Sequence, residues 1–309
     1  MDRLRGFLRE TYRLEPAALT PAERGFYGET WRLDTTDSRL FVKLDASPHR
    51  DVYRRSFHVV EHLRCHGIDF ISRIVKTADG ALCADFDGAV LGVFDWIDGA
   101  HIENDDTKFP EYDMLARVYA VPGEGLFIPR EDFSGRSAGI FFGQWERLKR
   151  MPARPDAALL PELLGRHRGE LTRRARRLEL FAGRCAGDTA SFFVTHGDAG
   201  GNLIQNGDKS YLVDWDEAML APSERDAWVM CPCDWAREAF QNALRRHGVG
   251  YALRPERLAY YCYYMFFFYL TAFMDEYLGG SNQADTVGEI KRYFEGFIEE
   301  RVRYADTIV

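Results

Sequence analysis

The chain has 309 residues, of which 46% are hydrophobic and 28% charged, a balance typical of a globular protein with room for two domains and a sizeable core. The net charge of -8 argues against a general nucleic-acid binder, because a phosphate backbone attracts basic surfaces. Of the six scattered cysteines only Cys231 and Cys233 are near neighbours, and the absence of a second pair at zinc-ligand spacing favours free thiols and a reducing cytoplasm.

Neither the start of the sequence nor its longest apolar run predicts membrane targeting. Met1–Arg5 begins a charged amphipathic helix rather than a signal peptide. The longest apolar run, Tyr260–Met274, is shorter than the roughly 20 residues that a membrane-spanning helix needs. We therefore expect it to be a buried helix and the protein to be cytoplasmic, with no membrane partner.

The first part of the chain is rich in predicted strands. A helix over residues 2–13 is followed by a glycine-containing bend, Gly25–Thr30, which leads into a strand at Trp31–Asp34. Glycines let a backbone approach phosphate oxygens closely, although such a bend is most often an ordinary hairpin. The remaining elements expected here are strands at 39–44, 71–76, 81–86 and 89–94 and a helix at 51–66.

Lys43 stands in the strand predicted at 39–44. Alternation places Leu40, Val42 and Leu44 on one face, and Phe41 and Lys43 on the other. An exposed edge lysine is the ordinary alternative. Its position after a glycine bend and before a helix favours a lysine that projects into a cleft and meets phosphate oxygens.

The pattern changes from strands to helices after Asp95-Trp96-Ile97-Asp98-Gly99, so we place a domain boundary between residues 98 and 99, and a cleft with it. A loop is expected at Pro122–Ser134. The basic run Arg173–Arg177 lacks interleaved aromatic residues and is expected to be a solvated helix face that pairs with nearby acids. Helices are predicted at 110–119, 139–149, 166–181, 226–247, 256–277 and 287–305.

Two acid-bearing motifs lie close together in this second part. His196-Gly197-Asp198 is followed by Asn202, and a hydrophobic strand then ends in Val213-Asp214-Trp215-Asp216. We expect the strands Phe192–Thr195 and Tyr211–Val213 to form a hairpin around an Asn206-Gly207-Asp208 turn and to bring Asp198, Asn202 and Asp214 together. Such residues in turns often make only turn hydrogen bonds. The paired motifs instead favour a base beside a site for a hard cation, as phosphoryl transfer requires.

With these motifs, the sequence resembles the aminoglycoside phosphotransferase family over nearly its whole length. His196–Asn202 resembles the catalytic loop, Val213–Asp216 the metal-binding motif and Phe94–Gly99 the hinge between lobes. Leu220–Asp226 is similar to the spectinomycin phosphotransferase-like branch. The resemblance implies an α+β, two-lobed protein-kinase-like fold, with a β-rich nucleotide-binding lobe at 1–98 and a mainly helical lobe at 99–309.

The resemblance also implies a role for each matching residue. Asp198 would orient and deprotonate the substrate hydroxyl, and Asn202 and Asp214 would hold Mg²⁺ on the phosphates of ATP. Lys43 would neutralise the α- and β-phosphates. Backbone groups of Asp95 and Ile97 would pair with adenine, and the bend Gly25–Thr30, with its glycines Gly25 and Gly28, would cover the phosphates.

The sequence departs from the family at two places. Only three residues, Ala199-Gly200-Gly201, separate Asp198 from Asn202, where the family usually has four. The helix position whose glutamate normally pairs with the strand lysine holds Ser56, and Glu61 or Asp51 is the alternative partner.

For the acceptor, the resemblance implies acidic residues on the helical lobe that meet amino groups. Asp275 and Glu276 are candidates, and two exposed acids at a helix end are the ordinary alternative. We expect a kinase acting on a hydroxyl of an aminoglycoside or aminocyclitol, and hence antibiotic resistance. The alternatives are a metabolic kinase of the choline, homoserine, methylthio-sugar or fructosamine type, and a nucleotide-binding pseudokinase without turnover. GTP remains open as the phosphate donor.

Overall fold

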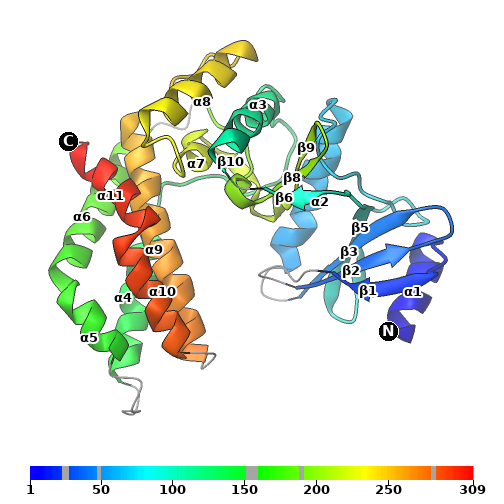
Figure 1. Cartoon of the computed structure of the whole chain (residues 1–309), viewed down its shortest axis with the longest axis horizontal. Helices are drawn as coiled ribbons and strands as arrows, with labels where there is room; N and C mark the ends of the chain where they lie inside the picture. Colours follow the sequence, from blue (N-terminus) through cyan, green and yellow to red (C-terminus); the bar gives the residue numbers. More distant parts are fainter. Residues whose placement is uncertain are drawn as a thin grey trace. The chain divides into compact units, whose positions relative to one another are not determined.

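The computed structural model describes residues 1–22, 28–46, 50–102, 104–150, 159–187, 191–279 and 283–308. The chain packs as two units, each treated below by itself (Figure 1). The first unit contains residues 1–130, 193–221 and 243–249, and the second contains 131–192, 222–242 and 250–309. The first unit continues past residue 98, and the lobe boundary at 98 and 99 stays a prediction.

The first unit is built on an antiparallel five-stranded sheet with the order β1-β2-β3-β5-β4. The predicted strands at 31–34, 39–44 and 89–94 are confirmed, whereas the segment predicted as a strand at 71–76 makes only an isolated bridge between Ile74 and Phe94. The strands are β1 (Ala18–Pro21), β2 (Glu29–Asp34), β3 (Arg39–Asp45), β4 (Ala84–Phe86) and β5 (Ala89–Asp95).

The two faces of this sheet bury different side chains. Leu40 and Val42 of β3 join Leu91 and Val93 of β5 in a hydrophobic core with helix α1 (Asp2–Tyr12). Alternation along the strands places Phe41, Lys43, Gly92 and Phe94 on the opposite face. Helix α2 (Arg50–Cys65) packs on this second face, where Phe57 stacks on Phe94 with ring centroids 5.2 Å apart. The predicted alternation in β3 is therefore confirmed.

Gly92 sets how closely α2 approaches the sheet. A Cβ atom at this position would lie 2.1 Å from Cζ of Phe57 and 2.9 Å from the hydroxyl of Tyr53. We expect Gly92→Ala to lower the free energy of unfolding by about 1–3 kcal/mol, because it overpacks a filled interface. Urea denaturation measures this change, and Gly139→Ala is the control, since an added Cβ at this exposed position meets nothing within 4 Å. Equal stability of Gly92→Ala and wild type would contradict the close approach.

The remaining strands of the first unit carry the two motifs. Strand β7 (Phe193–Thr195) pairs with β10 (Met219–Ala221), so the predicted hairpin between Phe192–Thr195 and Tyr211–Val213 is wrong. The hairpin instead joins β8 (Leu203–Asn206) to β9 (Lys209–Leu212), with Gly207 at φ 58° in its turn. The turn signal was correct, but the strand before it begins only after Asn202. The short strand β6 (Ala100–His101) pairs with β8, and α3 (Lys108–Tyr119) follows it.

The second unit is helical and is centred on α9 (Pro255–Gly279), whose aromatic residues are mostly buried. The prediction of a buried helix is confirmed, and no helix among the described residues is both long and apolar enough to cross a bilayer. Around α9 pack α4 (Arg136–Lys149), α6 (Arg168–Cys185), α7 (Glu224–Ala227), α10 (Gln283–Glu295) and α11 (Phe297–Thr307) (Figure 1).

Two predicted helices are each interrupted. The segment 226–247 divides into α7 and α8 (Asp234–Arg246), with Pro232 between them, because proline has no N–H to continue a helix. The segment 287–305 divides into α10 and α11 at Gly296, a poor helix former. Helix α5 (Leu159–Arg166) was not predicted.

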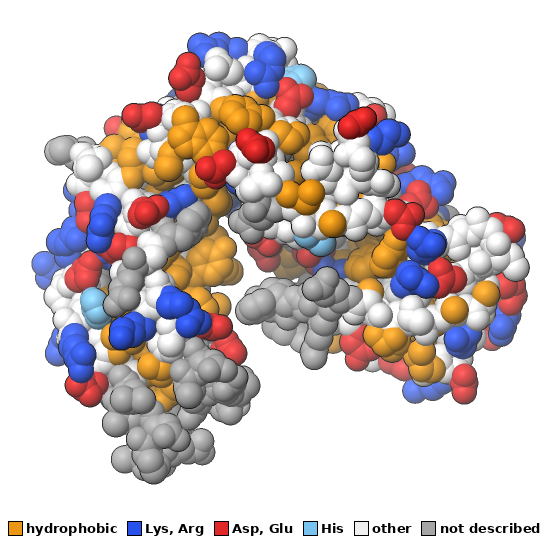
Figure 2. All heavy atoms as spheres, in the orientation of Figure 1, with side chains coloured by type: hydrophobic (Ala, Val, Ile, Leu, Met, Phe, Trp, Pro, Cys, Tyr) orange, Lys and Arg blue, Asp and Glu red, His pale blue; other side chains and the backbone are white. Residues whose placement is uncertain are grey.

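The basic run on α6 is only partly solvated. Arg174 is 1% exposed, lies over the ring of Phe266 and pairs with Glu170 and, at 2.7 Å, with Glu299. Arg173 pairs with Asp306 nearer the surface. The expected pairing with acids is confirmed, whereas the expectation of full exposure is wrong for Arg174. Acidic and basic side chains are interspersed over the visible described surface (Figure 2).

Candidate active site

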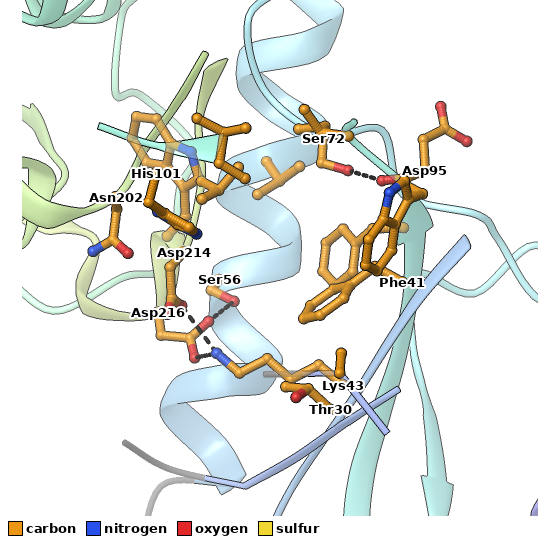
Figure 3. Close-up of a pocket in the computed structure, with 18 of the residues that line it drawn as sticks. Thr30, Phe41, Lys43, Ser56, Ser72, Asp95, His101, Asn202, Asp214 and Asp216 are labelled. Carbon is orange, nitrogen blue, oxygen red and sulfur yellow. Dashed lines mark hydrogen bonds and ion pairs between the residues drawn. The ribbon is translucent and has the colours of Figure 1, made fainter. Parts of the chain in front are cut away.

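A cavity of about 560 Å³ lies within the first unit, beneath the face of the sheet that carries Lys43 (Figure 3). Its apolar part is lined by aromatic and aliphatic side chains, and its polar part by an ammonium, two carboxylates and an amide. Figure 3 shows Asn202, Asp214 and Asp216 on one side, with Lys43 reaching toward the aspartates. The apolar lining comprises Phe41, Val60, Phe94, Trp96, Ile97, Ile204 and Val213, and the polar lining includes Lys43, Asn202, Asp214 and Asp216.

Lys43 is held between two carboxylates. Its Nζ atom donates to Oδ1 of Asp214 at 2.9 Å and to Oδ2 of Asp216 at 2.5 Å. Burial alone would lower the pKa of Lys43, but the charges of Asp216 and Asp214 outweigh burial and raise it. The lysine is therefore a fixed cation at the polar end of the cavity.

Asp214 follows strand β9 in an unusual backbone conformation. Its φ of 62° and ψ of 68° lie in the left-handed region, which non-glycine residues seldom adopt. The next residues form the 3₁₀ helix η3 (Trp215–Glu217), which packs against α2. This turn aims Asp214 and Asp216 at the same ammonium group, and strained residues of this kind cluster at functional sites.

The short loop after Asp198 is a single 3₁₀ turn, η2 (Ala199–Gly201). It returns Asn202 to Asp198, where the Asn202 amide donates to the Asp198 backbone oxygen at 2.6 Å and to its carboxylate Oδ2 at 3.1 Å. The backbone oxygen of Asn202 also accepts from the N–H of Val213 at 3.0 Å. The expected approach of Asp198, Asn202 and the Asp214 segment is confirmed, even though the loop has only three residues.

His196 holds this loop through hydrogen bonds of its ring. Its Nδ1 accepts the N–H of Asp198 at 3.2 Å, so its Nε2 carries the proton and donates to the carbonyl of Val213 at 2.8 Å. The ring is fully buried and packs against Trp215. These contacts join the two motifs and agree with a structural rather than chemical role for His196.

The surroundings of Asp198 raise the pKa of its carboxyl group. Loss of hydration raises the pKa of Asp198, the hydrogen bond from Asn202 lowers it, and the charge of Asp214 raises it further. The net shift is upward. A carboxylate with a raised pKa binds a proton more strongly and is thus a better general base.

The residues around Asp214 fit a magnesium ion. Among the described residues, Oδ1 of Asn202 and Oδ2 of Asp214 accept no hydrogen bond, and both residues line the cavity. No group of three or more His, Cys, Asp and Glu side chains in the described part of the chain could hold a metal. Mg²⁺ needs no such group, because it is usually held by one or two carboxylates together with substrate phosphates and water.

The end of β5 and the segment after it line the apolar end of the cavity. The N–H of Asp95 donates to the carbonyl of Arg73. The carbonyl of Asp95 accepts from the hydroxyl of Ser72 at 2.7 Å, which leaves one lone pair on the Asp95 oxygen. The N–H of Ile97 has no acceptor among the described residues. The side chain of Asp95 forms two hydrogen bonds with Arg73 and does not serve the cavity. One acceptor and one donor are therefore available here.

The sequence profile of the phosphotransferase enzyme family matches residues 18–261, which is most of the chain. The chain belongs to the phosphotransferase enzyme family. It is thus a small-molecule phosphotransferase with an alcohol group as acceptor. A search of the curated protein sequences finds no significant match.

Solved structures of kinases share the fold of this phosphotransferase. Spectinomycin phosphotransferase APH(9)-Ia, in complex with ADP and spectinomycin, superposes with a TM-score of 0.80 at 16% identity, covering 98% of each chain. A microcompartment-associated aminopropanol kinase superposes with a TM-score of 0.64 at 14% identity, and the match covers 98% of this chain and 97% of the kinase. Choline kinase from Cryptosporidium parvum Iowa II superposes with a TM-score of 0.57 at 12% identity, and the match covers 94% of this chain and 90% of the choline kinase. The predicted α+β, protein-kinase-like fold is confirmed.

The other predicted site residues of this phosphotransferase lie in three places. Gly25 is outside the described residues. Gly28 precedes β2 at φ 80°, and a Cβ there would lie 2.2 Å from the Leu44 carbonyl, so this position requires glycine. Asp275 and Glu276 are exposed on α9 of the second unit, where Asp275 accepts from Gln144 of α4 at 2.5 Å. Their parts in binding phosphate and acceptor stay predictions.

Sequence reasoning missed two residues of the site. Asp216 belongs to the predicted metal-binding motif, but its contact with Lys43 was not predicted, although an acid two residues after Asp214 was a readable signal. Ser72, which donates to the carbonyl of Asp95, lies in a segment wrongly predicted to be a strand, and the sequence gave no signal for this contact. The two acids weighed as partners for Lys43 are elsewhere: Glu61 pairs with Lys76 at 2.5 Å, and Asp51 is exposed.

Proposed function

We propose that this phosphotransferase uses ATP and Mg²⁺ to phosphorylate a hydroxyl of an amino-bearing small molecule, an aminoglycoside or aminocyclitol. The observation that carries the proposal is the ion pair of Lys43 with Asp214 in one cavity with Asn202. A cation for phosphates and oxygen ligands for a metal thus face the same space. Phosphoryl transfer depends mainly on such positioning and electrostatic stabilisation.

The apolar end of the cavity suits adenine. Phe41, Phe94 and Trp96 supply aromatic surface, and the purine would lie between them and the aliphatic side chains opposite. Adenine offers an amino donor beside a ring nitrogen acceptor. The free lone pair of the Asp95 carbonyl and the N–H of Ile97 match that pattern.

At the polar end, each residue has one task. Lys43 would neutralise the α- and β-phosphates, and Gly28, with Gly25 before it, would let the backbone cover them. Asn202 and Asp214 would hold Mg²⁺, which supplies charge neutralisation on the phosphates when bound. Asp198 would accept the proton of the acceptor hydroxyl, whose oxygen then bonds to the γ-phosphorus as the bond to the β–γ bridging oxygen breaks and ADP departs.

The preference for an amino-bearing acceptor is supported by the acids on α9 and by the likeness to spectinomycin phosphotransferase. Exposed carboxylates at Asp275 and Glu276 are suited to ammonium groups. The aminopropanol and choline kinases have the same fold, and their substrates also carry a cationic nitrogen, so they define the second candidate class.

A coupled ADP-release screen tests the proposal. The acceptors are spectinomycin-like aminocyclitols, aminoglycosides, choline, aminopropanol, homoserine, a methylthio-sugar and a fructosamine, each with ATP or GTP, with and without EDTA. We expect ADP release with an aminocyclitol or aminoglycoside, ATP and Mg²⁺. Release only with a metabolic amino alcohol or sugar would move the assignment to the second class. Stabilisation by ATP without turnover of any acceptor would identify a nucleotide-binding pseudokinase.

The acids on α9 give a second prediction. Asp275→Asn and Glu276→Gln are expected to raise KM for the amino-bearing acceptor by about threefold to tenfold, because a charge pair at an exposed site is worth about 1 kcal/mol. KM for ATP should not change. Glu146→Gln on α4 is the control, since this exposed acid pairs only with its neighbour Lys149 among the described residues. An unchanged acceptor KM in both variants would remove these residues from the acceptor site.

A further inference from the structure

The ammonium group of Lys43 has an unusual set of partners. In protein kinases the corresponding strand lysine is held by a glutamate of the following helix, and this pair must be in place for activity. Here α2 presents Ser56 toward the cavity, while Glu61 pairs with Lys76 and Asp51 is exposed. Among the described residues, both anionic partners of Lys43 come from the segment after β9.

The two partners are not equivalent. Asp214 is 43% exposed at its side chain, lines the cavity and has the free oxygen suited to a metal. A carboxylate committed to a metal gives up part of its charge to that metal. The side chain of Asp216 is 23% exposed and makes the shorter contact with Nζ, at 2.5 Å. Asp216 can therefore hold Lys43 while Asp214 serves the metal.

The surroundings of Asp216 orient its carboxylate. Its Oδ2 accepts from Lys43, and its Oδ1 lies 3.4 Å from the hydroxyl of Ser56, which also donates to the carbonyl of Tyr53 at 2.8 Å. The helix α2 thus contacts the carboxylate through a small hydroxyl (Figure 3). The space that a helix glutamate would fill is taken by an acid that enters from η3.

We propose that Asp216 is the positioning residue for Lys43 and replaces an acid on α2. The proposal rests on the proposed function, since it takes Lys43 to bind phosphates. It has a mechanical consequence: the lysine is anchored to the same segment that carries the metal-binding Asp214. A small shift of α2 would therefore leave the Lys43 ion pair intact, whereas an acid on the helix would move with it.

The first test is Asp216→Asn. We expect kcat/KM for ATP to fall about tenfold to a hundredfold, because the lysine loses its fixed position. The Mg²⁺ concentration for half-maximal activity should stay within about twofold of wild type, and thermal unfolding should remain a single transition. Asp208→Asn is the matched control, because this acid is exposed on the β8–β9 turn outside the cavity. Wild-type kcat/KM in Asp216→Asn would overturn the proposal.

The second test moves the acid to the helix. Ser56→Glu combined with Asp216→Asn is expected to recover at least tenfold of the lost kcat/KM, since the side chain at 56 already lies beside the carboxylate that holds Lys43. A structural or metal-binding role for Asp216 predicts no recovery. A tenfold rise in the Mg²⁺ requirement of Asp216→Asn without rescue by the double variant would make Asp216 a metal ligand and overturn the proposal.

Two further measurements distinguish a failure of the Asp216 proposal from misfolding of the variant and from a failure of the proposed function. If Asp216→Asn does not fold, Asp216→Glu takes its place, because it keeps the charge but displaces the carboxylate; wild-type kcat/KM in that folded variant would count against a positioning role, and a tenfold fall would support it. Turnover by the wild type is measured in the same series. Its absence would contradict the proposed function, whereas the proposal about Asp216 fails only when an active wild type and its variants behave alike.

Discussion

Asp198→Ala is expected to reduce kcat by roughly a thousandfold or more, with the Kd for ATP unchanged. The substitution removes the carboxylate that would accept the proton of the acceptor hydroxyl. It leaves the backbone oxygen of Asp198, to which the Asn202 amide also donates, so the loop keeps one of its two anchors. Steady-state ADP release gives kcat, and calorimetry with ATP and Mg²⁺ gives Kd.

The control for this experiment is Asp208→Ala, an exposed acid on the nearby hairpin turn that does not line the cavity. It should keep wild-type kcat and ATP affinity. A kcat for Asp198→Ala within tenfold of wild type would contradict the assignment of a general base. Loss of ATP binding in the same variant would mean that Asp198 supports the fold of the loop instead.

Lys43→Ala is expected to weaken ATP binding by roughly thirtyfold to 150-fold, equivalent to the roughly 2–3 kcal/mol that a hydrogen-bonded charge contributes. The phosphates lose a cation that is buried and fixed before they arrive. The removal also leaves Asp214 and Asp216 facing each other. Because the Asp214 side chain is 43% exposed and can recover water, we expect the fold to persist.

Thermal unfolding with and without ATP measures both effects at once. Lys43→Ala should unfold in one transition within a few degrees of wild type and should gain little from ATP. Lys76→Ala is the control, because this lysine pairs with Glu61 on the surface of the same unit. A collapsed melt for Lys43→Ala would make the lysine a structural residue. An undiminished ATP effect would place the phosphates elsewhere.

Local patterns predicted the parts of the site that depend on neighbouring residues. Alternation in β3 correctly placed Lys43 opposite Leu40 and Val42, since side chains of a strand alternate between faces. The Gly207 turn was also correct. The contact between Asn202 and Asp198 depends on the three intervening residues, which form one 3₁₀ turn, so it too is set by residues close in the sequence.

Contacts between distant segments could not be predicted in the same way. The pairing of β7 with β10 was missed, because a three-residue strand gives no signal for which partner it joins. The partner of Lys43 was missed because Asp216 reaches it through the left-handed conformation of Asp214, which the sequence does not reveal. Propensity alone also could not show that Gly296 would divide the last helix.

The central claim is that one cavity holds the nucleotide and its metal between Lys43 and the Asp198–Asp214 motifs. Anomalous diffraction from crystals grown with Mn²⁺ and a non-hydrolysable ATP analogue tests it most directly. The account predicts a manganese peak about 2.0–2.3 Å from Oδ2 of Asp214 and Oδ1 of Asn202, with the purine at Ile97. A peak bound away from Asp214, or a purine outside the cavity that Phe41 and Phe94 line, would contradict it.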